Sequence, residues 1–313
     1  MEIIDLTETR PHDSTPLTLV LGQFDGVHKG HQHILQTSKK QKTADETLAV
    51  MSLSDHPLWI RNQNPDFEKR MTPDRDRLHL LEQFGVEKYY QINHTQGDVK
   101  YPLEEWVFNY LARLNIKRLI FGEGFRFGFD ESFHMEKFLD LCAKRNIEIT
   151  TVPQVKVNGT KISSQTIRGY IKKGLMEPVH ALLGRPFTIT GTVIHGEKMG
   201  RKLGFPTINL GEMENYVEPK PGVYLGMVGI HKKEGIIDYW DTLISTGYRP
   251  TVNGEGYLIE AHLLNFSGDL YNQTVSISFL RFMREELNFD SLDKLIEQME
   301  KDKIEGERLM GHF

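Results

Sequence analysis

Two histidines three residues apart stand in a glycine-rich segment that follows the first strongly apolar run of the chain. From Gly22 to His31 the sequence reads GQFDGVHKGH. Glycines let a backbone approach a ligand closely, and the first turn of a helix offers unpaired N–H groups to phosphate. His28 and His31 project from one side of such a turn. These residues predict a site that binds a triphosphate and stabilises charge at the α-phosphorus while pyrophosphate leaves.

A second glycine-rich segment, Gly191 to Asn209, lies in the other half of the chain and reads GTVIHGEKMGRKLGFPTIN. No Gly-x4-Gly-Lys-Ser/Thr pattern occurs, so any phosphate in this half is bound by another arrangement. The glycines permit backbone N–H groups to surround phosphates. Thr207 and Asn209 carry hard oxygen atoms, and in a strand both would point to one face. That pattern suits a phosphate-bound Mg²⁺.

The first half of the chain alternates strand-like apolar runs with amphipathic stretches. The expected strands are Leu17–Leu21, Leu48–Leu53, Val86–Ile92, Arg118–Phe121 and Ile147–Val152. The expected helices are His31–Lys40, Asp74–Phe84, Leu103–Leu114, Phe133–Arg145 and the polar segment Ser164–Lys173. Strands that alternate with helices indicate a doubly wound parallel sheet, which binds ligands beyond the carboxyl ends of its strands.

The second half is rich in strands separated by Gly, Pro and Asn, and it ends in one helix. The expected strands are Phe187–Ile194, Gly222–Val228, Ile236–Ile244, Tyr257–Phe266 and Thr274–Phe282, and the helix is Ser291–Lys303. This pattern indicates a small antiparallel barrel with a terminal helix. We therefore predict an α/β domain over residues 1–183 and a β-barrel domain over residues 184–313, joined by a short connector after residue 173.

Composition excludes several classes of protein. Of the 313 residues 39% are hydrophobic, so the chain is not intrinsically disordered, and no apolar run approaches the roughly 20 residues of a membrane span. The net charge of -5 lacks the basic excess of a nucleic-acid-binding domain. The single cysteine, Cys142, permits neither an intrachain disulfide nor a thiolate metal cluster. Since the N-terminal stretch also lacks the layout of a signal peptide, we expect a cytoplasmic protein without nucleic-acid or membrane partners.

Three segments of the first half are similar to one enzyme family. Gly22–His31 resembles the His-x-Gly-His signature of nucleotidyltransferases, in the Phe-Asp-Gly-Val-His form of the flavin-adenylylating module of bacterial FAD synthetases. Ile162–Arg168 resembles Ile-Ser-Ser-Thr-x-Ile-Arg, and Gly122–Gly128 resembles Gly-x-Asp/Asn-Phe-x-Phe-Gly. The resemblance implies that His28 and His31 stabilise the transferring phosphate. The implied nucleotide-binding residues are Gly22, Phe24, Gly30, Ser163, Ser164 and Arg168.

The second half resembles riboflavin kinases through Gly-x-Val-x-x-Gly followed by Gly-Phe-Pro-Thr-x-Asn. The family's catalytic base opens a Glu-x-His-Leu segment, which here begins at Glu260, and a carboxylate can accept the proton of an attacking hydroxyl. The resemblance implies Thr207 and Asn209 as metal ligands. The implied nucleotide-binding residues are Gly191, Gly196, Gly200, Lys202 and Gly204, and the implied flavin-binding residues are Arg249, Thr251, Arg284 and Glu285.

Leu17 to Met299 is therefore similar to bacterial bifunctional riboflavin kinase/FAD synthetase. The implied substrates are riboflavin, FMN and ATP, with Mg²⁺ as cofactor and FAD as the last product; the sequence says nothing of the oligomeric state. The first half differs from the family pattern at three residues: Gln23 stands where the family has Asn, Gly124 where it has Asp or Asn, and Gln165 where it has Thr. In addition, Ser54–Pro57 matches the family's Asp-Pro-His-Pro only loosely.

Because of these departures, the sequence does not require that both activities work. Adenylyl transfer could be weakened, lost or altered, which would leave a riboflavin kinase with a degenerate first domain. The barrel could instead be the inactive half, or the chain could be a regulatory protein that binds flavin without turnover. Asp25 either touches a ligand or braces its loop.

Overall fold

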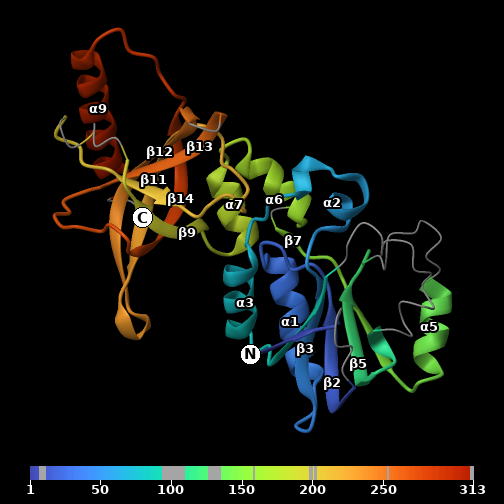
Figure 1. The fold of residues 1–313 in the computed structure, drawn as a ribbon. Coiled ribbons are helices and arrows are strands. Elements are labelled where there is room, and N and C mark those ends of the chain that lie inside the picture. The colour runs from blue at the N-terminus through green and yellow to red at the C-terminus, as the bar shows by residue number, and fades with distance from the viewer. Residues whose placement is uncertain are drawn as a thin grey trace. The chain divides into compact units, whose positions relative to one another are not determined.

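The computed structural model describes residues 1–6, 12–93, 110–125, 135–157, 159–196, 200, 203–251 and 254–310. The chain divides into two compact units, Met1–Ser164 and Gln165–Phe313 (Figure 1). This division falls before the predicted domain boundary, because helix α7 (Met176–Leu183) packs on two strands of the second unit. The predicted connector between residues 173 and 184 therefore contains a helix.

The first unit is built on a six-stranded parallel sheet in the order β1-β4-β3-β2-β5-β6. Its strands are β1 (Glu2–Asp5), β2 (Asp13–Leu21), β3 (Thr47–Leu53), β4 (Lys88–Ile92), β5 (Leu114–Gly122) and β6 (Glu148–Val152). Side chains of β2 alternate between two cores, since Leu19 and Leu21 belong to one cluster and Val20 to the other. Both faces of the sheet are therefore covered, as the apolar runs predict.

Helices accompany these strands in chain order. They are α1 (Lys29–Gln41), α2 (Pro57–Asn62), the 3-10 turn η1 (Pro65–Phe67), α3 (Asp74–Gln83) and α5 (Met135–Ala143). The strands β3 and β5 lie on either side of β2, so the chain reverses its direction of winding there. The carboxyl ends of β2 and β5 then flank the crevice in which a doubly wound sheet binds ligands.

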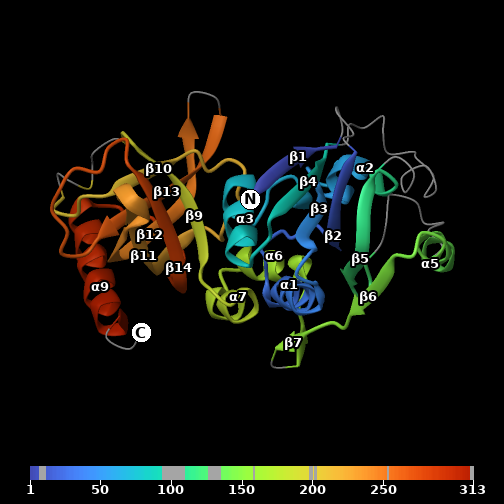
Figure 2. The same cartoon turned by 90° about the horizontal axis from the view of Figure 1, so that it is seen from below.

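The second unit is a closed antiparallel barrel in the order β10-β13-β12-β11-β14-β9 (Figure 2). Its strands are β9 (Phe187–Ile194), β10 (Ile208–Gly211), β11 (Gly222–His231), β12 (Ile237–Thr251), β13 (Gly254–Leu263) and β14 (Thr274–Arg284). The terminal helix α9 (Leu292–Met310) packs on β12, where a side chain at Gly306 would meet Leu243 Cδ2 at 2.8 Å. The predicted barrel with a terminal helix is confirmed.

A small hairpin and a helix follow the sheet and precede the barrel in chain order. The hairpin consists of β7 (Lys156–Val157) and β8 (Thr160–Lys161), and the helix is α6 (Ser164–Ile171). The hairpin, β1 and α2 have no counterpart in the sequence predictions, because elements of two to six residues carry too little periodicity to be recognised. The predicted helix Leu103–Leu114 ends too late, since Leu114 opens β5, and residues 103–109 lie outside the described residues. Residues 133–134 of the predicted helix Phe133–Arg145 also lie outside the described residues.

Cys142 lies on α5 in the core of the first unit and is 1% exposed. Burial raises the pKa of its thiol to about 11. At neutral pH the side chain is therefore a protonated thiol that packs as a small apolar group.

Candidate active sites

The segment Gly22–His31 lies where the first strand of the doubly wound core passes into its helix. Strand β2 ends at Leu21, and α1 begins at Lys29 with His28 as its N-cap. The Nδ1 atom of His28 accepts a hydrogen bond of 3.2 Å from the backbone N–H of His31. The loop thus stands at the carboxyl edge of the sheet, beside the crevice.

Three rings are packed together at this helix start. The imidazoles of His28 and His31 stack with centroids 3.6 Å apart and an interplanar angle of 13°, and the ring of Phe24 lies 4.8 Å from that of His31. Burial, together with the neighbouring His28, lowers the pKa of His31 well below 6.5. Among the described residues, His31 Nδ1 has no hydrogen-bond partner. The structure thus brings the two predicted histidines together, with His31 neutral near pH 7.

The backbone of this loop is held in an unusual conformation. Phe24 and Val27 have φ of 53° and 37°, and both side chains are wholly buried. Because side chains other than glycine rarely adopt positive φ, the packing of these two must stabilise the loop. A Cβ atom at Gly22 would lie 2.9 Å from the Phe24 ring, and one at Gly30 would lie 3.1 Å from the His28 ring. The buried Phe24 side chain therefore supports the loop; contact of Phe24 with nucleotide stays a prediction.

Asp25 braces the loop against the segment that precedes α3. Its Oδ1 accepts hydrogen bonds from the backbone N–H groups of Met71 at 2.9 Å and Thr72 at 3.1 Å. In return Thr72 Oγ1 accepts one from Gly26 N at 2.8 Å. The Asp25 carbonyl also accepts a hydrogen bond of 3.0 Å from Ser164 Oγ. The sequence leaves two roles open for Asp25, ligand contact and bracing of its loop, and these hydrogen bonds show the bracing role.

Two buried arginines behind the loop have no counterpart in the sequence predictions. Arg77 is fully buried, donates from Nη1 to the Gln23 carbonyl at 3.2 Å and pairs with Asp74 at 2.8 Å. Arg70 lies 3.5 Å from Asp55 Oδ1, and burial, with Arg77 beside it, lowers its pKa. The helical period marks charged positions of a helix as solvated, so it gives no signal for the burial of Arg77, and Arg70 precedes α3 and belongs to no helical pattern.

The remaining predicted residues of the first site lie on two other segments. Gly124 follows β5 with φ of 82°, and a Cβ atom there would lie 3.6 Å from Gln154 Nε2. Arg126, Phe127 and Gly128 of the same motif lie outside the described residues. Ser163 and Ser164 stand at the start of α6, and Arg168 on that helix is 4% exposed. Direct contacts of these residues with a nucleotide stay predictions.

In the barrel, Asn209 and Glu260 are directly opposite one another on neighbouring antiparallel strands. Strand β10 pairs with β13 through Ile208↔Ala261 and Asn209↔Glu260. Side chains of directly opposite residues lie on the same face of a sheet, roughly 5 Å apart at Cβ. Thr207 precedes β10 by one residue. The predicted base and one predicted metal ligand are thus side by side.

Glycines of the second motif surround these side chains. A Cβ atom at Gly196 would lie 2.4 Å from Asn209 Nδ2, and one at Gly200 would lie 3.3 Å from Thr207 Oγ1. Gly191 instead faces the Gly211 carbonyl, which a Cβ atom would meet at 2.1 Å, so close strand packing accounts for glycine there. Gly204 has φ of 86° with no atom within 4 Å of an added Cβ. Lys202 lies outside the described residues.

The predicted flavin-binding residues gather where β12 and β14 end. Arg249 pairs with Glu286 at 2.9 Å, and Glu285 pairs with Lys220. A Cβ atom at Gly247 would lie 2.3 Å from Glu286 Oε1, so this glycine leaves room for that carboxylate. Thr251 belongs to β12, but its side chain lies outside the described part of the chain.

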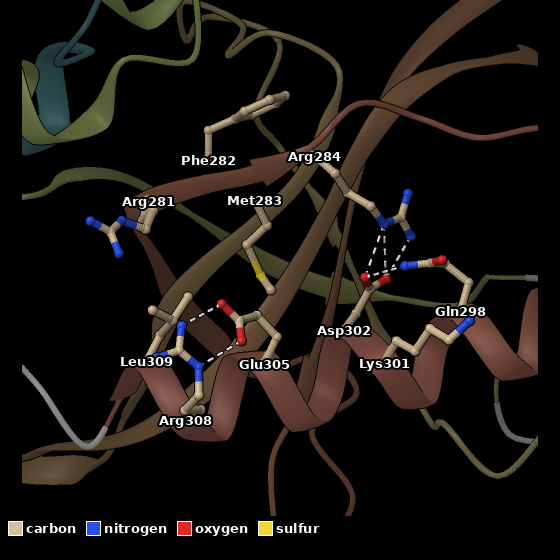
Figure 3. A pocket seen from close by; sticks show the side chains of 10 residues that line it. All are labelled: Arg281, Phe282, Met283, Arg284, Gln298, Lys301, Asp302, Glu305, Arg308 and Leu309. Atoms are coloured by element: carbon tan, nitrogen blue, oxygen red, sulfur yellow. Dashed lines mark hydrogen bonds and ion pairs between the residues drawn. The ribbon is translucent and has the colours of Figure 1, made fainter.

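The side chain of Arg284 reaches toward Asp302 on α9 (Figure 3). Its Nη2 lies 2.6 Å from Asp302 Oδ2, and its Nε donates to both Asp302 oxygens at 3.0 and 3.1 Å. Gln298 donates to Asp302 Oδ1 at 2.9 Å, on the wall of a cavity of about 390 Å³ between β14 and α9 (Figure 3). This ion pair anchors the terminal helix; a flavin contact of Arg284 stays a prediction.

Two kinds of feature are absent from the described residues. No group of three or more His, Cys, Asp or Glu side chains in those residues could hold a metal ion. None of the described helices has both the length and the apolar composition required to cross a bilayer.

Comparisons with known proteins cover both units. The model of the FAD synthetase family matches residues 10–166, and the riboflavin kinase model matches residues 183–310. A bifunctional riboflavin kinase/FMN adenylyltransferase from Bacillus subtilis is 32% identical over 97% of this chain and 98% of its own. An FAD synthetase from Listeria monocytogenes is 34% identical over 74% of this chain and 89% of its own.

Among solved structures, one titled as a macrolide-efflux protein from Streptococcus pneumoniae has the same fold across both units. It superimposes with a TM-score of 0.84 at 28% identity, over 97% of this chain and 98% of that one.

Proposed function

The chain belongs to the family of bifunctional riboflavin kinase/FMN adenylyltransferases, and we propose that its two sites make FMN and then FAD. In the first reaction the 5′-hydroxyl of riboflavin attacks the γ-phosphorus of ATP, which yields FMN and ADP. In the second, the phosphate of FMN attacks the α-phosphorus of another ATP, which yields FAD and pyrophosphate. The observation that carries the proposal is the pairing of Asn209 with Glu260 beside the glycine-rich loop.

In the kinase reaction Glu260 accepts the proton of the attacking hydroxyl. Phosphoryl transfer depends mostly on positioning and on neutralising charge, so a base needs only to stand at the hydroxyl while the phosphates are held. Backbone N–H groups of the loop around Gly196 and Gly200 hold those phosphates, because glycine has no side chain to shield them. We assign Arg249, Thr251 and Glu285 to the flavin end of the site, whereas the guanidinium of Arg284 binds Asp302 on α9.

The residues present also fit a phosphate-bound Mg²⁺. Thr207 offers a hydroxyl and Asn209 an amide oxygen, both hard donors, next to Gly200 and Gly196 of the loop that holds phosphate. A magnesium ion bound there neutralises charge on the phosphates of ATP.

In the adenylyl transfer the first unit acts through charge and position. His28 and His31 stand at the N-terminus of α1, where helix N–H groups favour phosphate. A triphosphate beside His31 favours its protonated form, so binding supplies the positive charge that the free site lacks. We place both reactions in the cytoplasm, with riboflavin, FMN and ATP as small-molecule substrates.

Separation of the flavin products tests the proposal. The purified protein is incubated with ATP and Mg²⁺, in one tube with riboflavin and in another with FMN. FMN in the first tube and FAD in both are expected.

Each of the remaining outcomes would replace the proposal with a narrower function. FMN without FAD would mean that Gln23, Gly124 and Gln165 have silenced the adenylyl-transfer site. FAD from added FMN, with no product from riboflavin, would place the loss in the barrel. Flavin binding without any turnover would identify a regulatory protein.

A further inference from the structure

His262 bonds to the segment that carries the proposed metal ligands. It lies on β13, two residues after Glu260, and both face away from the barrel interior, where Ile259, Ala261 and Leu263 are buried. Its Nδ1 atom lies 2.8 Å from the carbonyl oxygen of Pro206. Since that carbonyl can only accept, Nδ1 donates, which fixes the proton on Nδ1 in the neutral ring.

A second contact holds the same ring. The imidazole packs edge-on against Phe205, with centroids 5.5 Å apart at 64°, and Phe205 is only 4% exposed. The ring is thus fixed on one side by a buried aromatic and at its edge by a hydrogen bond. It holds the peptide that joins Pro206 to Thr207 in one orientation.

This orientation matters because Thr207 lies outside the strand ladder. Strand β10 begins at Ile208, whose partner is Ala261, and pairing ends there. Extending the register by one residue puts Thr207 opposite His262, but the structure has no backbone ladder at that position. The His262 side chain supplies the bond to Pro206 that a ladder would otherwise have supplied near this point. Before Ile208 the segment is also held by a backbone hydrogen bond of 2.9 Å from Phe205 N to the Gly200 carbonyl. The His262 bond adds an anchor at Pro206, the residue directly before Thr207.

We propose that His262 is a positioning residue of the kinase site, which aligns Thr207 with Asn209 so that both reach one magnesium-bound phosphate group. The inference rests on the proposed function, because it assigns His262 a part in the same phosphoryl transfer. In this role His262 transfers no proton. Its ring holds Pro206, and Pro206 in turn sets the orientation of the Thr207 hydroxyl. Groups that orient ligands in this way typically contribute about 10- to 100-fold in metal affinity or activity.

Steady-state kinetics of His262→Ala and His262→Asn test this assignment. For His262→Ala we expect FMN formation to fall by about 10- to 100-fold, with a higher Mg²⁺ concentration for half-maximal rate and an unchanged KM for riboflavin. Asn carries an amide N–H that can donate to the same carbonyl, so His262→Asn should recover part of the rate and of the Mg²⁺ response. His180→Ala, at an exposed histidine of α7, is the matched control and should leave all three quantities unchanged.

The first unit supplies an internal control for folding. FAD formation from added FMN should be equal in all four proteins, since His262 lies in the barrel unit. An unchanged Mg²⁺ response in His262→Ala would overturn the inference. So would equal loss in both variants accompanied by a lower unfolding temperature of the barrel, because that result assigns His262 to the fold. Wild-type protein that makes no FMN would instead contradict the proposed function.

Discussion

The two proposed sites are built in different ways. In the first unit the candidate residues stand on loops beyond the carboxyl ends of β2 and β5 and at the starts of α1 and α6. In the barrel, Asn209 and Glu260 are members of paired strands, and their relative position is set by the register of β10 and β13. Strand pairing therefore fixes Asn209 relative to Glu260 in the second site, whereas the first site depends on contacts that each loop makes for itself.

The departures from the family pattern follow this difference. Gln23, Gly124 and Gln165 all stand on loops or a helix start of the first motif set, where a changed side chain leaves the sheet undisturbed. In the barrel a change at Gly191 would place a Cβ atom 2.1 Å from the Gly211 carbonyl and disturb two strands. A substitution at Gly191 therefore costs strand packing that a substitution on the loops of the first motif set does not.

Reciprocal inactivation is the strongest test of two independent sites. Glu260→Gln keeps the size of the side chain but removes the base, so FMN formation should fall by about 10²- to 10⁴-fold. His28→Ala removes one of the two rings proposed to stabilise the transferring phosphate and should lower FAD formation by about 10²- to 10³-fold. Each variant should retain the other activity, measured by flavin chromatography. Loss of both activities in either folded variant would contradict the separation of the sites.

Removing the brace of the first loop should affect stability and one activity together. Asp25→Ala leaves the backbone N–H groups of Met71 and Thr72 without their acceptor, so we expect a loss of about 1–3 kcal/mol in the unfolding free energy of the first unit. FAD formation should fall while FMN formation is retained. Asp25→Asn keeps the oxygen acceptor and is the control. Urea unfolding of both variants makes the comparison, and equal stability of Asp25→Ala and wild type would contradict the bracing role.

Placing an amide at residue 124 tests whether this position contacts the substrate of adenylyl transfer. Gly124 has φ of 82°, a conformation that Asn tolerates better than most residues, and its Cβ would make ordinary contact with Gln154. If the new amide binds substrate, one hydrogen bond corresponds to about a 2- to 10-fold gain in kcat/KM for FAD formation. Gly159→Asn, at φ of 77° in open space, is the matched control for backbone strain. An equal effect in both variants would show that residue 124 does not contact substrate.

The stability of the first unit should decline in mild acid because of His31. The pKa of this ring is lowered well below 6.5, so below pH 6.5 the unfolded chain binds the proton more readily than the folded one. Stability from this group is complete above pH 6.5 and decreases as pH falls toward the lowered pKa. Unfolding temperatures between pH 7.5 and 5.5 measure the slope, and His31→Asn should reduce it. ATP should reduce it as well, because a bound triphosphate favours the protonated ring.

The sequence predicts the sheet and the barrel well, since long periodic segments such as Leu17–Leu21 and Phe187–Ile194 identify their own secondary structure. The spacing of the first motif also predicts that His28 and His31 meet, and their rings stack. The family resemblance assigns Asn209 and Glu260 to one site, and the strand register pairs them. Contacts between segments far apart in the chain are not encoded in any local pattern. The contact between Asp25 and the segment at Met71 and the burial of Arg77 therefore appear only in the structure.

Arg284 illustrates the limit of transferring a role by motif. Its position in the sequence places it at the end of β14, beside the predicted flavin residues, but its guanidinium binds Asp302 on α9. The direction of a long side chain depends on which partner the fold offers, and that partner is 18 residues away.

The buried thiol of Cys142 has a practical consequence for spectroscopy. Maleimide and similar dyes react with thiolates, and a thiol with pKa of about 11 that is 1% exposed stays unlabelled at neutral pH. A cysteine introduced on any exposed position would then be the sole attachment point without prior removal of the native one. Two variants, one with a dye on the first unit and one with a dye on the barrel unit, would report separately on nucleotide binding at each unit during a single turnover.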